Sequence, residues 1–199
     1  MQLHLNKTSP YARVARITAL ELGLDNQLTL CWSDPWTDEP ALVAVNPASR
    51  VPTLITDQGI AISESLLIAQ YLDSLDGQGR LLPATHLAEV LHKAGLGQGL
   101  IDAAFNTVIA RKYLGEDADE SVLGQRRLRA IIRSLSSLER MLGSPTATRI
   151  DLGDIVIGVG LAYLDFRLAE IDWQATCPAL ADYQARLLER DSFIQTGFN

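Results

Sequence analysis

Ser9 stands directly before Pro10 at the predicted start of a helix, so its hydroxyl is the first candidate for chemistry in this chain. Serine is a preferred N-cap and proline is favoured at the first helical position, so capping alone would explain the pair. The free amides and the dipole of a helix N-terminus also favour negative charge, and a hydroxyl there can donate a hydrogen bond to a thiolate. Such a bond would lower the pKa of the thiol without the serine reacting. A Ser-His-Asp hydrolase is not indicated, because the chain has no Gly-x-Ser-x-Gly turn and its three histidines lie elsewhere.

The second candidate is the short apolar strand that opens with Arg50-Val51-Pro52. Proline has no N–H to donate, so the groups before it stay available to a ligand instead of a neighbouring strand. This free edge indicates a peptide-binding site, although an ordinary edge-strand proline would have the same sequence. Glu64 and Ser65 follow at the start of the next predicted helix, where capping by them or by Ser63 is the competing explanation.

The N-terminal half that carries these residues has the pattern of a βαβ unit followed by a ββα unit. Its long loop over residues 33–50 contains three prolines, and a loop of that length in a compact domain is functional or mobile. The predicted strands and helices are residues 3–6, 10–22, 27–32, 53–56, 60–62 and 65–75.

The C-terminal half is predicted to be all helical. Apolar residues recur at helical spacing from Leu87 and again between Leu128 and Leu142, which indicates two long antiparallel helices, the second ending at 143–145. Glycines interrupt the first of these helices; they weaken or kink its middle and allow close backbone approach. They are Gly95, Gly97 and Gly99.

A third helix is strongly encoded at Asp151, where a capping box with Asp154 and a hydrophobic staple between Ile150 and Ile155 are expected. Residues 155–164 are apolar on every side, which predicts a fully buried helix that is too short to span a bilayer. A last helix should begin at Pro178 and run to about residue 190.

Composition excludes several classes of function. The 199 residues, of which 47% are hydrophobic, suffice for a sizeable core, and a net charge of −7 gives no general attraction to nucleic acid or anionic lipid. The N-terminus lacks the features of a signal peptide, so a cytoplasmic location is expected, with Cys31 and Cys177 as free, buried thiols. No metal is expected, because three candidate ligands on one helix are spaced too widely to surround one ion: His86, Glu89 and His92.

Taken together, four segments resemble the cytosolic glutathione transferase family, and in particular its small bacterial members. They are Ser-Pro-Tyr-Ala-Arg-Val-Ala-Arg at 9–16, Asn-Pro-Ala-Ser-Arg-Val-Pro-Thr-Leu at 46–54, Glu64-Ser65, and the capped buried helix from Asp151 that ends near Leu-Asp-Phe-Arg at 164–167. Their order and spacing match the family over nearly the whole chain. The resemblance implies an α/β thioredoxin-like domain with a four-stranded mixed sheet (residues 1–76), a linker (77–84) and an all-α helical-bundle domain (85–199). It also implies a homodimer and a role in detoxification.

The resemblance further implies how glutathione, as co-substrate, would be bound. Ser9 would stabilise its thiolate, with Thr8 as the alternative hydroxyl. The backbone of Val51, beside a cis Pro52, would pair with the cysteinyl part, and Arg50 would hold the glycyl carboxylate. The γ-glutamyl end would meet Ser65 through its carboxylate and Glu64 through its ammonium group. Asp102 would reach the ammonium group of the glutathione bound by the partner subunit.

The electrophile is expected in an apolar pocket beside the thiol, although residues of these types are more often core or rim. Its candidate residues are Thr8, Tyr11, Trp36, Phe105, Asn106 and Tyr113. The implied function is a glutathione transferase whose thiolate attacks a small hydrophobic electrophile. Two alternatives stay open: a glutathione-dependent isomerase or dehalogenase acting on a metabolic substrate, and a non-catalytic, transferase-like scaffold that binds a protein. The identity of the electrophile does not follow from the sequence, because members of one fold differ in substrate.

Overall fold

A computed structural model describes residues 1–142 and 150–198, with the side chains of Glu116 and Leu142 excepted. The chain divides into two compact units. Unit 1 contains Met1–Leu87 together with the residues from Asp191 on, and unit 2 contains Ala88–Arg190. No helix formed by the described residues combines the length and the apolar character that a membrane crossing requires.

Unit 1 is built on a four-stranded mixed sheet with the order β2-β1-β3-β4. Strand β1 (Gln2–Leu5) is parallel to β2 (Thr29–Trp32) and antiparallel to β3 (Thr53–Ile55), which in turn is antiparallel to β4 (Ala61–Ser63). The pairing of β3 with β4 confirms the predicted hairpin, and the mixed sheet confirms the predicted thioredoxin-like arrangement.

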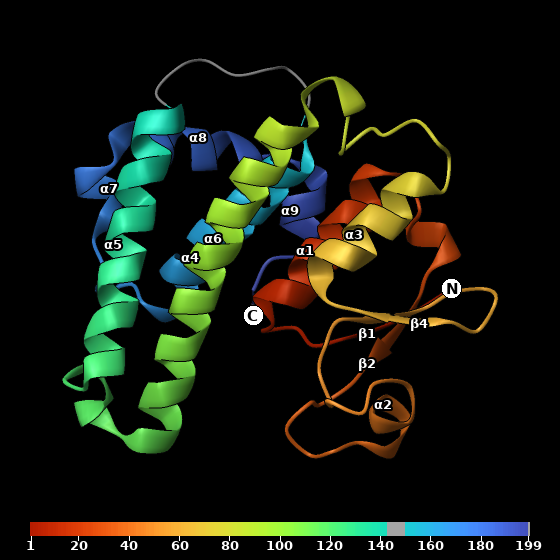
Figure 1. Cartoon of the computed structure of the whole chain (residues 1–199), viewed down its shortest axis with the longest axis horizontal. Coiled ribbons are helices and arrows are strands. Elements are labelled where there is room, and N and C mark those ends of the chain that lie inside the picture. Colours follow the sequence, from red (N-terminus) through yellow and green to blue (C-terminus); the bar gives the residue numbers. More distant parts are fainter. Residues whose placement is uncertain (143–149, 199) are drawn as a thin grey trace. The chain divides into compact units, whose positions relative to one another are not determined.

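Helices α1 (Pro10–Glu21) and α3 (Ser65–Ser74) pack against each other on one side of this sheet, and α2 (Pro40–Val45) lies on the other (Figure 1). Because both faces are covered, β1 is buried from its second residue onward. The side chains of Leu3, Leu5, Ile17, Leu54 and Ile68 form the centre of this core, each at most 2% exposed.

Helix α2 corrects the prediction that residues 33–50 form one loop. The prolines in this segment suggested irregular structure, but Pro40 occupies the first turn of the helix, where a missing N–H costs nothing. The buried side chain of Leu42 anchors the short helix to the rest of unit 1.

The last residues of the chain group with the sheet, whereas the predicted division assigned everything from residue 85 onward to the helical domain. Helix α9 (Asp191–Gln195) packs on α1. The Arg13 guanidinium donates to the Thr196 hydroxyl and to the Phe193 carbonyl, and the Ser192 hydroxyl donates to Glu21. These contacts join segments that are more than 170 residues apart in the sequence.

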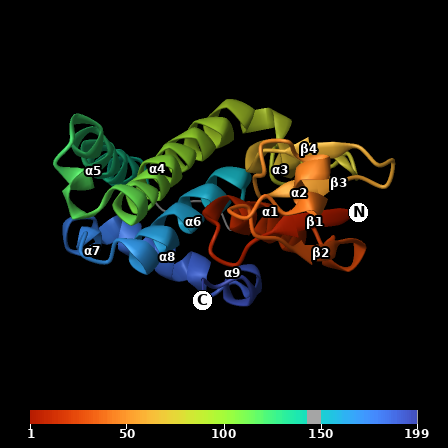
Figure 2. The same ribbon diagram turned by 90° about the horizontal axis from the view of Figure 1, so that it is seen from below.

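Unit 2 is all helical, as predicted. It contains α4 (Leu87–Leu114, whose first residue belongs to unit 1), α5 (Val122–Leu142), α6 (Leu152–Arg167), α7 (Trp173–Thr176) and α8 (Pro178–Leu188). Helices α4 and α5 run side by side in both views (Figures 1 and 2). The predicted end of α5 at 143–145 lies outside the described residues.

Helix α6 has the capping box predicted from the sequence. The Asp151 side chain accepts the Asp154 N–H at 3.0 Å, and the Asp154 side chain accepts the Asp151 N–H at 2.9 Å. Both carboxylates also contact the Lys93 ammonium group. Although burial lowers the pKa of Lys93, its hydrogen bonds to the two carboxylates raise it above the ordinary value, so this cation stays charged. Every residue of α6 from Leu152 to Leu164 is buried, so the helix forms the centre of unit 2.

The glycines of α4 differ in what surrounds them. A Cβ at Gly97 would lie 2.8 Å from the Ile157 nitrogen and 2.9 Å from the Val156 carbonyl carbon, both in the backbone of α6. A Cβ at Gly95 or Gly99 would meet nothing within 4 Å. The predicted close backbone approach is therefore confirmed at Gly97 alone.

We predict that Gly97→Ala destabilises the protein by about 1–3 kcal/mol, because the backbones of α4 and α6 must move apart. Gly99→Ala is the matched control; it should stabilise the protein by up to about 1 kcal/mol, because alanine favours helix and the space is open. Urea unfolding of the two variants measures both effects. Equal effects of the two substitutions would contradict the close approach.

Candidate functional site

Ser9 is the N-cap of α1, and Pro10 occupies the first turn, as the sequence predicts. The Ser9 Oγ accepts a hydrogen bond from the Ala12 N–H at 3.2 Å. An oxygen that accepts this bond still has its own hydrogen to donate. The half-buried Ser9 hydroxyl can therefore cap the helix and donate to an anion at the same time.

Thr8, the alternative hydroxyl, is engaged differently. Its Oγ1 donates to the Asn6 Oδ1 at 2.9 Å, and its backbone N–H donates to the same oxygen at 2.9 Å. The hydrogen of the Thr8 hydroxyl is thus used inside the loop that precedes α1. This difference favours Ser9 over Thr8 as the donor to a bound anion.

The Val51–Pro52 peptide bond is cis, as the family resemblance implied. Both residues are buried, and they precede the first residue of β3. Within the described residues no hydrogen bond uses the backbone N–H or C=O of Val51. An amide and a carbonyl that are both open on one residue are what a ligand needs to pair like an added strand.

Asn46 holds this segment in place. Its Nδ2 donates to the Arg50 carbonyl at 3.1 Å and to the Thr53 Oγ1 at 3.0 Å, and its Oδ1 accepts the Ala48 N–H at 3.1 Å. The side chain is only 6% exposed. Sequence reasoning did not assign a role to Asn46, and the one signal that could have found it is its position directly before Pro47 in a turn.

Glu64 and Ser65 begin α3 in an unusual way. Glu64 is the N-cap residue and has a positive φ of 71°, a conformation that costs energy for a residue with a side chain. No side chain in the described part of the chain caps this helix, so the explanation that Ser63, Glu64 or Ser65 is there for capping is wrong. Among the described residues, the first amides of α3 beside the buried Ser65 therefore have no side-chain acceptor, and a helix N-terminus of this kind can bind an anion.

The strand register brings these segments together. His4 of β1 pairs with Thr53 of β3, and Thr53 pairs with Ser63 of β4. Because both pairings are antiparallel, the end of β1, the start of β3 and the end of β4 meet at one end of the sheet. The Arg50 Nη1 lies 3.8 Å from the Glu64 Oε1 there, in an exposed and hence weak ion pair. The N-termini of α1 and α3 follow β1 and β4 directly at this same end.

The other predicted site residues are spread over both units. Tyr11 lies half-buried on α1, and Trp36 is 53% exposed in the loop before α2. The remaining four are on α4 in unit 2, where the Asp102 carboxylate accepts a hydrogen bond from Gln98 and the Asn106 amide donates to the Asp102 carbonyl. The roles predicted for them stay predictions; they are Asp102, Phe105, Asn106 and Tyr113.

Comparison with known proteins gives a consistent picture. Residues 8–75 match the model of the glutathione S-transferase N-terminal domain. A glutathione S-transferase from Methylobacterium radiotolerans, solved in complex with glutathione sulfonate, is 31% identical, with a TM-score of 0.88 over 100% of this chain and 95% of that one. A glutathione S-transferase from Methylobacillus flagellatus, solved with glutathione bound, is 28% identical, with a TM-score of 0.89 over 98% of both chains. The stringent starvation protein A homolog of Pasteurella multocida is 29% identical over 98% of this chain and 89% of its own length.

We predict that Asn46→Ala lowers the free energy of unfolding by about 2–3 kcal/mol, since it removes three hydrogen bonds of a buried side chain. Chemical denaturation measures the change. Gln125→Ala, which removes an exposed side chain that donates to one backbone carbonyl, is the control and should cost no more than about 0.5 kcal/mol. If the two variants are equally stable, Asn46 does not hold the Val51–Pro52 segment.

Proposed function

This chain belongs to the glutathione S-transferase family, and we propose that its Ser9 hydroxyl stabilises the thiolate of bound glutathione for attack on a small hydrophobic electrophile. A glutathione transferase-type function is supported by the fold and by structural neighbours that bind glutathione. The observation that carries the assignment to Ser9 is its hydrogen bond from Ala12, which leaves the hydroxyl hydrogen as a donor at the N-terminus of α1.

Glutathione would lie across the end of the sheet. Its cysteinyl backbone would pair with the open amide and carbonyl of Val51, which sets the sulfur toward Ser9. The γ-glutamyl carboxylate would bind at the N-terminus of α3 through the Ser65 hydroxyl and the first amides, and the Glu64 carboxylate would accept from the ammonium group. Arg50 would hold the glycyl carboxylate. A protein of net charge −7 needs such local groups, because its overall field repels an anionic tripeptide.

The reaction needs no covalent intermediate with the protein. The thiol loses its proton to solvent, and the thiolate sulfur forms the new bond to carbon. In a substitution the leaving group departs with its electron pair, and in an addition a proton returns to the product carbanion. The protein contributes the lowered pKa of the thiol and the orientation of the sulfur.

The remaining parts of the proposal concern assembly and the second substrate. We place the electrophile against Thr8, Tyr11, Trp36, Phe105, Asn106 and Tyr113. In a homodimer, the Asp102 carboxylate would reach the ammonium group of the glutathione bound by the partner subunit. A cytoplasmic location and a role in detoxification complete the proposal.

We predict that Ser9→Ala lowers turnover of a model aryl halide about ten- to hundredfold at saturating glutathione. A hydrogen bond to a charged group contributes about 1.5–3 kcal/mol, and each 1.4 kcal/mol is a factor of ten in rate. The Ser9 hydroxyl lowers the pKa of the thiol. Removing the hydroxyl should therefore raise that pKa by about one to two units and shift the pH profile of turnover to higher pH by the same amount. Ultraviolet absorbance of the bound thiolate against pH measures the pKa directly.

Ser74→Ala is the matched control, since it removes an exposed hydroxyl that donates to the Tyr71 carbonyl on α3. It should leave both the rate and the profile unchanged. Thr8→Val separates the two candidate hydroxyls: a larger loss in Thr8→Val than in Ser9→Ala would move the role to Thr8. Unchanged turnover in Ser9→Ala would remove Ser9 from the mechanism.

The similarity to the stringent starvation protein A homolog, whose name states no transferase activity, keeps one alternative open: a scaffold that binds a protein and catalyses nothing. Calorimetric titration with glutathione addresses this alternative. We expect binding, and we expect Arg50→Gln to weaken it by about tenfold, because a charge-assisted hydrogen bond to the glycyl carboxylate is lost. A chain that neither binds glutathione nor forms a conjugate with any of a panel of electrophiles would be a scaffold. Turnover that consumes no glutathione would instead indicate an isomerase.

A further inference from the structure

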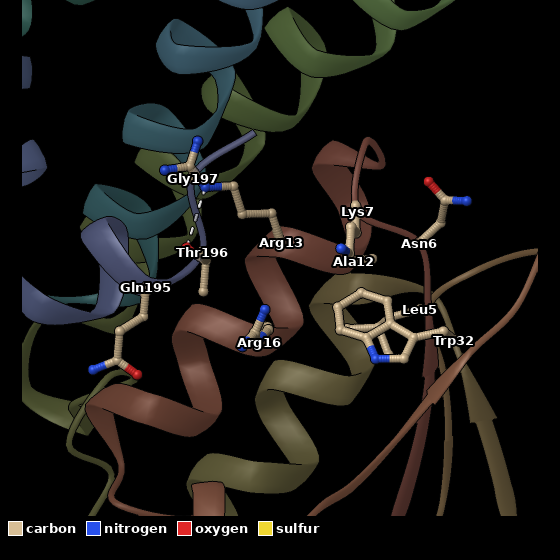
Figure 3. Close-up of a pocket in the computed structure, with 10 residues that line it drawn as sticks. All are labelled: Leu5, Asn6, Lys7, Ala12, Arg13, Arg16, Trp32, Gln195, Thr196 and Gly197. Carbon is tan, nitrogen blue, oxygen red and sulfur yellow. Dashed lines mark hydrogen bonds between the residues drawn. The ribbon is translucent and has the colours of Figure 1, made fainter. Parts of the chain in front are cut away.

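Unit 1 contains a cavity of about 240 Å³ lined by residues of the loop after β1, of α1, of the end of β2 and of the C-terminal segment (Figure 3). It is lined by Lys7, Arg13, Arg16, Trp32 and Thr196, among others, and we refer to it as the basic cavity. Trp32 ends β2, and the strand order β2-β1-β3-β4 places β2 and β3 on opposite sides of β1. The basic cavity is therefore separate from the segment Arg50–Pro52, and the function proposed above assigns no role to the cavity's charged side chains.

The lining of the basic cavity carries an excess of positive charge. Three of its lining residues are cationic and none is acidic, in a protein whose net charge is −7. No ion pair joins Lys7, Arg13 or Arg16 to any acidic group within residues 1–142 and 150–198. Like charges that gather without a counter-ion repel one another, so such a cluster indicates a place for an anion.

Arg13 makes this argument strongest, because it is only 6% exposed. Its guanidinium donates to two neutral oxygens, the Thr196 Oγ1 at 3.3 Å and the Phe193 carbonyl at 3.2 Å. It also lies 5.6 Å and 4.5 Å from the ring centres of Phe193 and Phe198. Burial lowers the pKa of Arg13 to about 10, so it remains charged at neutral pH. Its contacts with described residues use two of its five N–H donors, and a buried cation without an anionic partner is costly.

The other two cations gather around one aromatic ring. The Lys7 Nζ lies 5.6 Å and the Arg16 guanidinium 5.7 Å from the ring centre of Trp32. The indole is 48% exposed and provides an apolar surface beside the charges. Guanidinium groups match the planar geometry of carboxylate and phosphate oxygens, and an ammonium group adds a point charge.

We propose that the basic cavity binds a small organic oxyanion, whose carboxylate or phosphate group lies among Lys7, Arg13 and Arg16 and whose apolar part lies against Trp32. Size limits the ligand, because a cavity of about 240 Å³ is smaller than the roughly 300–1,000 Å³ typical of sites for drug-sized molecules. A monocyclic acid or phosphate ester fits this limit, and a dinucleotide does not.

The test uses the full chain and two probes, benzoate and phenyl phosphate, titrated by calorimetry at low salt. We expect binding of at least one probe, weakened about tenfold or more in the double variant Lys7→Gln/Arg16→Gln and falling as salt is added. Both side chains are at least partly exposed, so the double variant should fold, which its thermal unfolding verifies. Arg133→Gln, an exposed arginine on α5, is the matched control and should bind the probe like the unaltered chain.

Each remaining outcome decides part of the proposal. A preference between the two probes identifies the oxyanion as carboxylate or phosphate. Inorganic phosphate that binds as tightly as phenyl phosphate would overturn the contact with Trp32. The site itself is overturned if neither probe binds, if the double variant binds like the unaltered chain, or if saturating glutathione displaces the probe. Loss of activity in Ser9→Ala has no bearing on these results, so the two proposals fail independently.

Discussion

The antiparallel register that joins β1, β3 and β4 is the constraint on which the candidate site depends. Thr53 pairs with His4 on one side and with Ser63 on the other, so three loops that are far apart in the sequence leave the sheet at the same end. A slip of one residue would turn the side chains of β3 to the opposite faces and bury the wrong set. The fully buried Leu3 and Leu54, which are paired across β1 and β3, make that slip costly. The core therefore fixes the relative positions of Ser9, Val51 and Ser65 before any ligand arrives.

The same arrangement suits the proposed binding of an anionic tripeptide by an acidic protein. The N-termini of α1 and α3 follow β1 and β4, so both helices direct free amides and positive dipole ends to this end of the sheet. At α1 the Ser9 side chain caps one amide, whereas at α3 no side chain in the described residues does so. The capped N-terminus of α1 suits a hydroxyl that must keep a fixed orientation. The uncapped N-terminus of α3 suits a ligand carboxylate, which would accept from the free amides in place of a side chain. The positive φ of Glu64 is consistent with a strained backbone at a site that binds a carboxylate at the N-terminus of α3.

Local signals were sufficient to predict much of this structure. The capping box of Asp151 and Asp154 lies within four residues. The dipeptide Ser9-Pro10 marks the start of α1, and Pro178 alone marks the start of α8.

Helix α2 was missed because Pro40 was interpreted as a loop residue and not as the first residue of a helix. Asn46 was missed because its role depends on backbone carbonyl groups that only the folded loop brings within reach. The association of α9 with α1 could not be predicted either, since the contact between Arg13 and Phe193 spans 180 residues. The six residues expected around the electrophile are divided between the two units, so the sequence alone could not show that they meet.

The loop from Asn6 to Ser9 would contribute to both proposed sites. Asn6 holds the loop together by accepting both the N–H and the hydroxyl of Thr8. Lys7 lies between these two residues and lines the basic cavity, while Ser9 is the N-cap of α1 and belongs to the proposed glutathione site. These residues form a turn, in which the Ser9 N–H donates to the Asn6 carbonyl at 3.4 Å. Serving two sites would require a rigid turn, because a loop that moved to suit one ligand would misplace the group that serves the other. The two hydrogen bonds from Thr8 to Asn6 provide that rigidity, and because they engage the Thr8 hydroxyl inside the loop, they favour Ser9 as the proposed donor.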